Sequence, residues 1–251
     1  MNWMTDVRAS DAMFIELEEK IERLLQQMTD QEKVDLLSGK NMWESHGVPR
    51  LSVPPLRYTD GPHGMRGFWL SGDAGSTLIP CEAALAATFD EALITELGCL
   101  LGQEAAARGA HVLLGPCINM QRSPLFGRHF ECFSEDPHLT GQAAVAYVRG
   151  VQQHVAACAK HFVCNDQENF RHTVMAVVED RALHEVYLAP FEAAVREASV
   201  ETIMCGYNRV NGTFCSQNEW LMQRVCRDSW GFTGWFLSDW FGTQTTVDSI
   251  K

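Results

Sequence analysis

The stretch Gly234-Trp-Phe-Leu-Ser-Asp239-Trp240-Phe-Gly242 decides how the fold is interpreted. Its short run of bulky apolar residues is typical of a buried strand, and the run stops abruptly at a carboxylate and an aromatic side chain. In a parallel α/β protein, a carboxylate at the carboxyl end of a strand lies where ligands bind. Because Asp239 alone is also a common type of cap for a following helix, the functional interpretation depends on whether the pattern recurs.

Strands and helices alternate over most of the sequence. Apolar runs that predict strands lie at about 54–59, 111–114, 155–159, 202–205 and 234–238. Patterns of helical period lie at about 11–27, 29–39, 90–109, 139–153, 180–198 and 216–228. The capping boxes Thr29-x-x-Glu32 and Ser216-x-x-Glu219 mark two of the helix starts. This alternation predicts parallel strands joined by crossover helices.

We therefore predict an α/β fold, a single (β/α)8 TIM-barrel-type domain over residues 1–251. The length of 251 residues agrees with the ~250 typical of such barrels. A nucleotide-binding sheet is disfavoured because the sequence contains neither a Gly-x-Gly-x-x-Gly nor a Walker pattern.

The composition limits the partners. Lys and Arg number 20 against 32 Asp and Glu, so the net charge is −12, which disfavours nucleic acid. The sequence has no apolar run long enough for a membrane span and no signal-peptide core at its start. Nine cysteines, an odd number without a Cys-x-x-Cys pair, favour free thiols in a reducing compartment. We expect a cytoplasmic protein.

Polar residues follow several of the predicted strands. They are Asp60, Arg128, Lys160, His161, Tyr207 and Asp239. Lys160 is informative because it directly follows Val-Ala-Ala-Cys-Ala, where an unpaired ammonium group would be costly. It needs an acceptor, either a carboxylate such as Asp60 or a ligand hydroxyl, although a buried Lys–Asp pair could also serve only to order the barrel. Several cations beside several carboxylates indicate dense hydrogen bonding to a polyhydroxylated molecule, and they would keep a nucleophilic carboxylate ionised.

Five motifs in order resemble those of glycoside hydrolase family 3, most closely its β-glucosidase branch. They are Thr59-Asp60-Gly-Pro-His-Gly64, Gly127-Arg128-His-Phe-Glu131 with Glu135-Asp136-Pro137, Lys160-His161-Phe162 with Asn165, Met204-x-x-Tyr207-Asn208, and Ser238-Asp239-Trp240. Each is weak alone, but together they are specific, and they extend from about Leu24 to the end of the sequence.

The resemblance implies a retaining, exo-acting β-glucosidase that removes terminal non-reducing β-D-glucosyl residues from a β-glucoside or a short β-gluco-oligosaccharide. Asp239 matches the nucleophile that forms a covalent glycosyl-enzyme, and Asp60 matches the carboxylate that binds outer sugar hydroxyls. The other matches to substrate-binding residues are Arg128, Lys160, His161, Arg171, Met204, Tyr207 and Trp240, with Arg66 a weaker candidate. The resemblance implies no cofactor.

The acid/base of such an enzyme is not assigned. In the β-glucosidase branch it is a glutamate from a following α/β-sandwich domain, and we expect that domain and the last βα part of the barrel to lie outside this chain. The other branch carries a Gly-His-Gly-Asp pattern after Lys-His-Phe, where this sequence has Val163-Cys-Asn-Asp-Gln-Glu168. Neither Glu168 nor His172 fits the family role.

Two alternatives remain. The chain could be a catalytically inactive, truncated sugar-binding fragment, or a barrel aldolase that forms a Schiff base on Lys160. A metal site is disfavoured because the histidines show no His-x-x-x-His spacing. An apolar face left uncovered would favour an oligomer.

Overall fold

The computed structural model describes residues 3–67 and 75–250 and divides into two compact units, Met1–Arg57 and Tyr58–Lys251. The single domain over residues 1–251 therefore stays a prediction. In the described residues, no helix is both long enough and apolar enough to cross a membrane.

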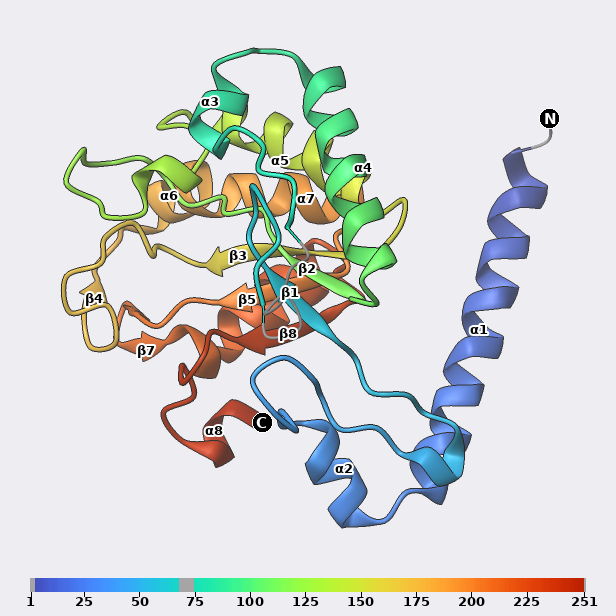
Figure 1. Cartoon of the computed structure of the whole chain (residues 1–251). Coiled ribbons are helices and arrows are strands. Elements are labelled where there is room, and N and C mark those ends of the chain that lie inside the picture. The colour runs from blue at the N-terminus through green and yellow to red at the C-terminus, as the bar shows by residue number, and fades with distance from the viewer. Residues whose placement is uncertain (1–2, 68–74, 251) are drawn as a thin grey trace. The chain divides into compact units, whose positions relative to one another are not determined.

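The first unit contains α1 (Trp3–Gln27), α2 (Asp30–Leu36) and η1 (Pro49–Leu51) (Figure 1). The predicted capping box at the start of α2 is confirmed, because Glu32 N donates to Thr29 Oγ1 at 3.2 Å and Thr29 N donates to Glu32 Oε2 at 2.8 Å. Arg50 donates from Nε to the same glutamate at 2.7 Å, and with Thr29 it lowers the pKa of Glu32 to about 2.

The second unit is built on a parallel sheet of five strands in the order β1-β2-β3-β5-β8. The strands are β1 (Tyr58–Asp60), β2 (Val112–Leu114), β3 (Ala156–Phe162), β5 (Thr202–Cys205) and β8 (Trp235–Ser238). Each strand pairs with the next strand of this sheet along the chain, as in a barrel formed by successive βα units. The predicted α/β class is confirmed.

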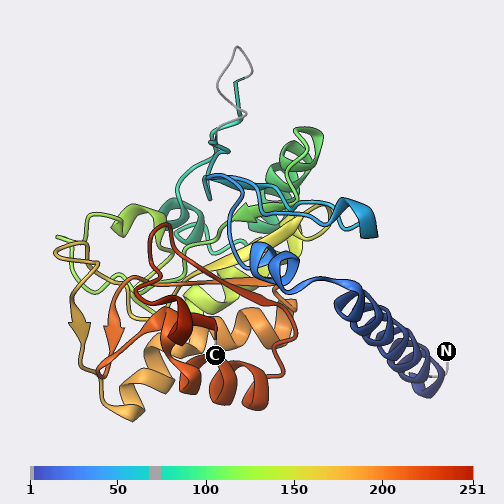
Figure 2. The same cartoon turned by 90° about the horizontal axis from the view of Figure 1, so that it is seen from below.

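Helices lie between these strands, except α8, which follows β8. They are α3 (Glu82–Ala86), α4 (Glu91–Ala107), α5 (Pro137–Val151), α6 (Asp180–Ala182), the π-helical η4 (Leu183–Leu188), α7 (Ala189–Ala198), the π-helical η6 (Trp220–Ser229) and α8 (Thr246–Ile250). Helices α4, α5 and α7 lie side by side along the sheet (Figures 1 and 2), with α5 in contact with both of the others. Asp90 and Asp136 cap α4 and α5 by accepting hydrogen bonds from backbone N–H groups of the first turn.

Glycines allow α4 and α5 to approach closely. A Cβ atom at Gly150 would lie 2.3 Å from the carbonyl oxygen of Thr95, and one at Gly98 would lie 2.7 Å from that of Tyr147. Both distances are far below ordinary contact, so any larger residue would push the helices apart.

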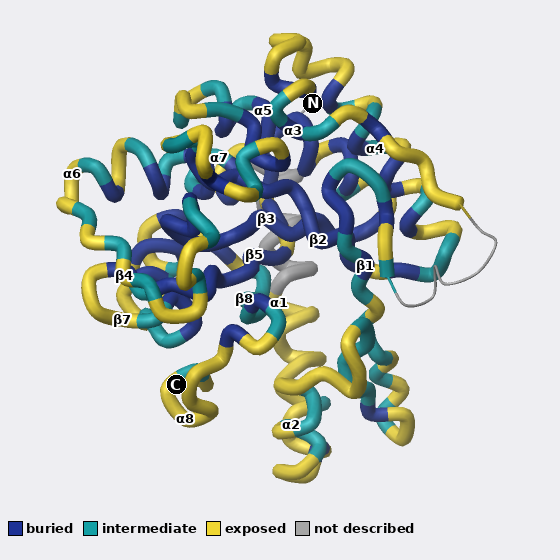
Figure 3. The backbone as a smooth tube through the Cα atoms, turned by 60° about the vertical axis from the view of Figure 1, so that its left-hand side comes forward, coloured by how far each residue is buried: buried dark blue, intermediate teal, exposed yellow. Residues whose placement is uncertain are grey.

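The core lies between the sheet and these helices. Strands β2, β3 and β5 are buried along their whole length, as Figure 3 shows, whereas β8 is only half-buried. Phe162 packs edge-on against Phe191, with ring centroids 5.0 Å apart, and against Trp230 at 6.3 Å. These contacts hold the carboxyl end of β3 in place.

The sequence did not reveal a second small sheet, and one predicted helix start is wrong. The small sheet contains β4 (Met175–Ala176), β6 (Arg209–Val210) and β7 (Thr213–Phe214). The capping box at Ser216 does not form, because its hydroxyl donates to Gly242 O at 2.9 Å and the residue belongs to the 3₁₀ turn η5 (Cys215–Gln217). Asn218 instead accepts from the N–H of Leu221 at 3.1 Å, near the start of η6.

Candidate active site

The carboxyl ends of β1 and β3 are joined by an ion pair. Lys160 Nζ donates to Asp60 Oδ1 at 2.8 Å, and Arg66 Nε donates to Asp60 Oδ2 at 3.0 Å. Burial opposes the charge on both members, but their attraction is stronger: the pKa of Asp60 lies well below its ordinary range and that of Lys160 is raised. The predicted acceptor for Lys160 is thus Asp60, and both groups are charged near neutral pH.

Lys160 and His161 both contribute to the site although they are neighbours in one strand. Successive side chains of a regular strand point to opposite faces. Here the pairing of β3 with β5 shifts between Lys160, which pairs with Met204, and Phe162, which pairs with Cys205. Asn119 holds the shifted backbone by accepting from His161 N and donating to His161 O, each at 2.9 Å.

The imidazole of His161 is neutral. Arg128 Nη1 lies 2.9 Å from His161 Nε2, and because arginine has no acceptor, Nε2 must be the unprotonated nitrogen. The proton is therefore on Nδ1, which lies 3.3 Å from Asn119 Oδ1. Burial, with the charges of Arg128 and Lys160, lowers the pKa of His161 well below its usual value. The 3.5 Å contact of Nε2 with Asp239 Oδ2 is consequently not an ion pair.

Arg128 is itself held by a buried carboxylate. Its Nε donates to Oε1 of Glu131, which ends the 3₁₀ turn η3 (His129–Glu131) and is almost fully buried. Glu131 belongs to the motif Gly127-Arg128-His-Phe-Glu131, and the sequence alone predicts no role for it. The signal that could have identified it is its i,i+3 spacing from Arg128, which brings the two side chains together within one turn.

Asp239 lies directly after β8 and is only 8% exposed. Its Oδ1 accepts the N–H of Trp240 at 2.7 Å. Burial and the adjacent Asp239 raise the pKa of Tyr207, whose hydroxyl is hydrogen-bonded to this carboxylate. The next helix, α8, begins only at Thr246, so Asp239 is not a helix cap.

Of the other predicted residues, Arg171 contacts Tyr207 and Met204 lies next to Lys160 in the sheet. Arg171 places its guanidinium 4.7 Å from the ring centroid of Tyr207 and donates to Glu168 Oε2 at 2.8 Å. Among the residues with described side chains, Glu168 Oε1 is one of the few buried polar atoms without a partner. Met204 is buried in β5 between Lys160 and Leu237.

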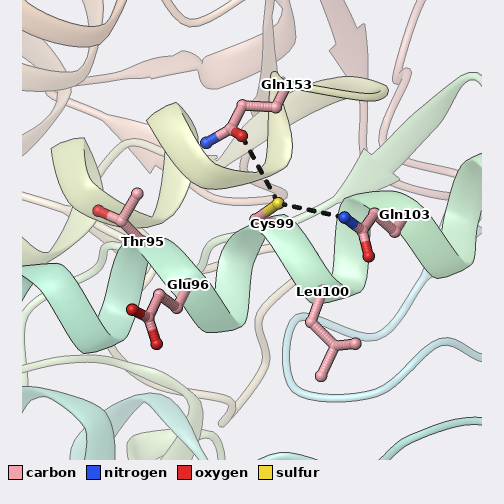
Figure 4. Close-up of a pocket in the computed structure, with 6 residues that line it drawn as sticks. All are labelled: Thr95, Glu96, Cys99, Leu100, Gln103 and Gln153. Carbon is pink, nitrogen blue, oxygen red and sulfur yellow. Dashed lines mark hydrogen bonds between the residues drawn. The ribbon is translucent and has the colours of Figure 1, made fainter.

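A shallow pocket elsewhere on the second unit is separate from this site. It is lined by Thr95, Glu96, Cys99, Leu100, Gln103 and Gln153, which come from α4 and the turn after α5 (Figure 4). None of these residues follows a strand. Within the described part of the chain, no group of three or more His, Cys, Asp or Glu side chains is arranged to hold a metal ion.

Comparison with known proteins gives consistent matches. The glycosyl hydrolase family 3 N-terminal domain model matches residues 18–251. A β-glucosidase of Rhizobium radiobacter is 49% identical over 233 residues, which are 92% of this chain and 28% of that protein.

Solved structures agree with the sequence match. β-Glucosidase 3B of Thermotoga neapolitana, in complex with glycerol, matches with a TM-score of 0.89 and 40% identity over 92% of this chain and 35% of that one. A β-glucosidase of Kluyveromyces marxianus in complex with glucose matches with a TM-score of 0.89 and 45% identity over 92% of this chain and 28% of that one. The chain thus spans about a third or less of the length of these relatives.

Proposed function

Since this chain belongs to glycosyl hydrolase family 3, we propose that its strand-end site binds the terminal glucosyl residue of a β-glucoside and that Asp239 attacks the anomeric carbon. One observation carries the proposal: a buried carboxylate, Asp239, lies between the neutral imidazole of His161 and the hydroxyl of Tyr207. Relatives named β-glucosidases, two of them solved with glucose or glycerol, support the choice of sugar.

The ion pair of Asp60 and Lys160 retains capacity for sugar hydroxyls. A carboxylate offers about four lone-pair sites and an ammonium group three donors. Lys160 uses one donor on Asp60, and Asp60 receives Lys160 on one oxygen and Arg66 on the other. Each group can therefore bind sugar hydroxyls as well, and because both are already ionised and paired, they need little reorganisation when the sugar binds.

Asp239 has one oxygen free of backbone contacts for attack. Oδ1 is held by the N–H of Trp240, whereas Oδ2 faces His161. Attack by Oδ2 would form the bond to the anomeric carbon as the glycosidic bond breaks, and water would later release the sugar with its configuration retained. This needs a second carboxyl group about 5–5.5 Å away to protonate the leaving oxygen. We propose that this group comes from outside these 251 residues.

A mechanism-based label tests the proposal. We would incubate the protein with 2-deoxy-2-fluoro-β-D-glucosyl fluoride, whose good leaving group reduces the need for an acid, and sequence the tryptic peptide 228–251 by mass spectrometry. Label on Asp239 supports the nucleophile, retention and a glucose pocket together. The Asp239→Asn variant is the control and should stay unlabelled.

The alternative of a catalytically inactive sugar-binding chain gives a different result. It predicts no label, together with glucose binding that is detectable by calorimetry and is lost in Asp60→Asn. If neither labelling nor glucose binding is found, the proposal is wrong for glucose, and xylosyl and galactosyl fluorides would test other sugars.

A further inference from the structure

Two buried thiols lie side by side next to the strand-end site, and the proposed hydrolysis does not use them. Cys117 follows β2 and Cys132 follows η3, and their Sγ atoms are 3.5 Å apart. Both are free cysteines with no exposed surface. An isolated parallel β-bridge pairs the two residues through their backbones.

Each thiol contacts a residue of the candidate site. Cys117 Sγ lies 3.7 Å from Nδ1 of His161, and Cys132 Sγ donates to the backbone oxygen of Arg128 at 3.6 Å. Arg128 Nη1 in turn donates a hydrogen bond to His161 Nε2 at 2.9 Å. The two sulfur atoms therefore lie against the backbone of Arg128 and the ring of His161, and His161 contacts Asp239.

We propose that Cys117 and Cys132 are a redox-modifiable pair, which hydrogen peroxide converts into a disulfide that closes the loop carrying Arg128. Peroxide first oxidises Cys117 to a sulfenic acid and is reduced to water. The sulfur of Cys132 then bonds to that of Cys117, and the sulfenic hydroxyl leaves with the thiol proton as a second water. Two thiols and one peroxide thus give one disulfide and two waters.

The order of reaction follows from the surroundings of each sulfur. The Nδ1–H of His161 faces Cys117 and can stabilise negative charge as it develops on that atom. The hydrogen bond with Cys117, together with burial, raises the pKa of Cys132, which keeps that residue a thiol until it attacks the sulfenic acid.

The geometry allows the bond without a large backbone change. Paired strands lie about 4.8 Å apart, and disulfides accept Cα separations of about 4.4–6.8 Å. The two sulfur atoms have to approach by about 1.5 Å, from 3.5 Å to the disulfide bond length. Rotation of the two side chains about χ1 can supply most of this movement.

A disulfide would change the site because it has no S–H group. Arg128 O would lose the S–H of Cys132 and keep only the N–H of Glu131 as donor, and the sulfur of Cys117 would be drawn away from His161. We expect glucoside binding to weaken by about fivefold, the effect of one lost hydrogen bond. Only this consequence depends on the proposed function.

Peptide mapping tests the disulfide without any activity. After peroxide treatment, remaining thiols are blocked with N-ethylmaleimide and the protein is digested with trypsin under non-reducing conditions. Cys117 lies in peptide 109–122 and Cys132 in peptide 129–149, and each of these peptides contains one cysteine. We expect the two peptides joined, two hydrogens lighter than their sum, and separated by dithiothreitol.

Cys81 and Cys99 are only half-buried, so their oxidation shows that the peroxide treatment has reached the protein. Recovery of Cys117 and Cys132 as separate alkylated peptides, under conditions that oxidise Cys99, would overturn the proposal. So would a disulfide from either residue to a different cysteine.

The binding effect has its own control. Glucoside binding should weaken on oxidation in the wild-type protein and recover with dithiothreitol, whereas the Cys117→Ser variant, which lacks the thiol that peroxide oxidises first, should bind equally well before and after peroxide. An equal loss in that variant would show that the disulfide does not affect the site. A protein that binds no glucoside in either state would count against the proposed function, and the peptide map would still decide the disulfide.

Discussion

Arg128 donates to Nε2 of His161 at 2.9 Å, and this contact determines both the charge and the tautomer of the imidazole. A protonated His161 would place two N–H groups against each other, so the ring stays neutral while Arg128 remains in place. His161 therefore acts at the site as an acceptor on one side and a donor on the other, and not as a cation beside Asp239.

The neutral state of His161 predicts a loss of stability in mild acid. Its pKa is lowered by folding, so below about pH 6.5 the unfolded chain takes up a proton that the folded chain does not. The free energy of unfolding should then fall by about 1.4 kcal/mol per pH unit from this residue alone. Denaturant unfolding at pH 7, 6 and 5, compared with His161→Gln, isolates the contribution, and equal slopes in the two proteins would contradict the neutral assignment.

In a protein that also holds the acid/base carboxyl proposed to lie outside these residues, Asp239→Asn should lower turnover of an activated aryl β-glucoside by about three or more orders of magnitude, as expected for loss of a nucleophile. The amide can still accept from Trp240 N, so the melting temperature should change little. Asp166→Asn is the matched control because Asp166 is equally buried, at 8% exposed, and contacts Arg122 instead of the site. We expect that variant to retain turnover; substantial residual activity in Asp239→Asn would remove the nucleophile assignment.

Asp60→Asn should destabilise the protein by about 3 kcal/mol, because it leaves the buried ammonium of Lys160 without its counter-charge. The double variant Asp60→Asn with Lys160→Met should regain much of this loss, since replacing a buried pair is less costly than breaking it. Chemical denaturation of the four proteins measures the coupling. If the two single effects simply add, the ion pair does not contribute as described.

The ion pair of Asp60 and Lys160 also predicts that the stability of the folded protein falls at acid pH. Folding lowers the pKa of Asp60, so its stabilising contribution is present above about pH 3.9 and is lost as the pH falls below that value. Wild-type protein should therefore lose more stability than Asp60→Asn between about pH 4 and pH 2. Parallel curves would show that Asp60 is not ionised in the folded protein.

Gly150→Ala should destabilise the second unit by about 2 kcal/mol or more, because the new methyl group would meet the carbonyl of Thr95 at 2.3 Å. Gly141→Ala in the same helix is the control. Its methyl group would lie 3.2 Å from the Cβ of Ala193 and 3.8 Å from the Cα of Pro190, and the substitution gains about 1 kcal/mol of helix propensity. Thermal unfolding of both variants should show a much larger loss for Gly150→Ala.

Much of the second unit could be predicted because its signals are local. The apolar run 202–205 is β5, and Asp90 caps the helix predicted to begin there. The failure at Ser216 has a physical cause: its hydroxyl is used by Gly242, a distant residue in the sequence, and local pattern gives no sign of that competition. The two-residue strands β4, β6 and β7 are too short to produce a periodic pattern.

The sequence identified which residues form the site, but not which of them contact one another. The motifs identified Asp60, Lys160 and Asp239, and the structure joins the first two at 2.8 Å. The role of Glu131 beneath Arg128 and the adjacency of Cys117 and Cys132 depend on how the loop after β2 returns upon itself. The path of this loop is decided by tertiary packing, which the spacing of residues in the sequence does not reveal.

A protein engineer who transplanted Lys160 and His161 into another barrel would have to transplant the register shift of β3 as well. In a regular strand the histidine would face the helices while the lysine faced the candidate site. The graft would also need an amide like that of Asn119, which holds both backbone groups of His161. Moving this site to another protein therefore requires strand β3 with its register shift together with Asn119, and not only the side chains of Lys160 and His161.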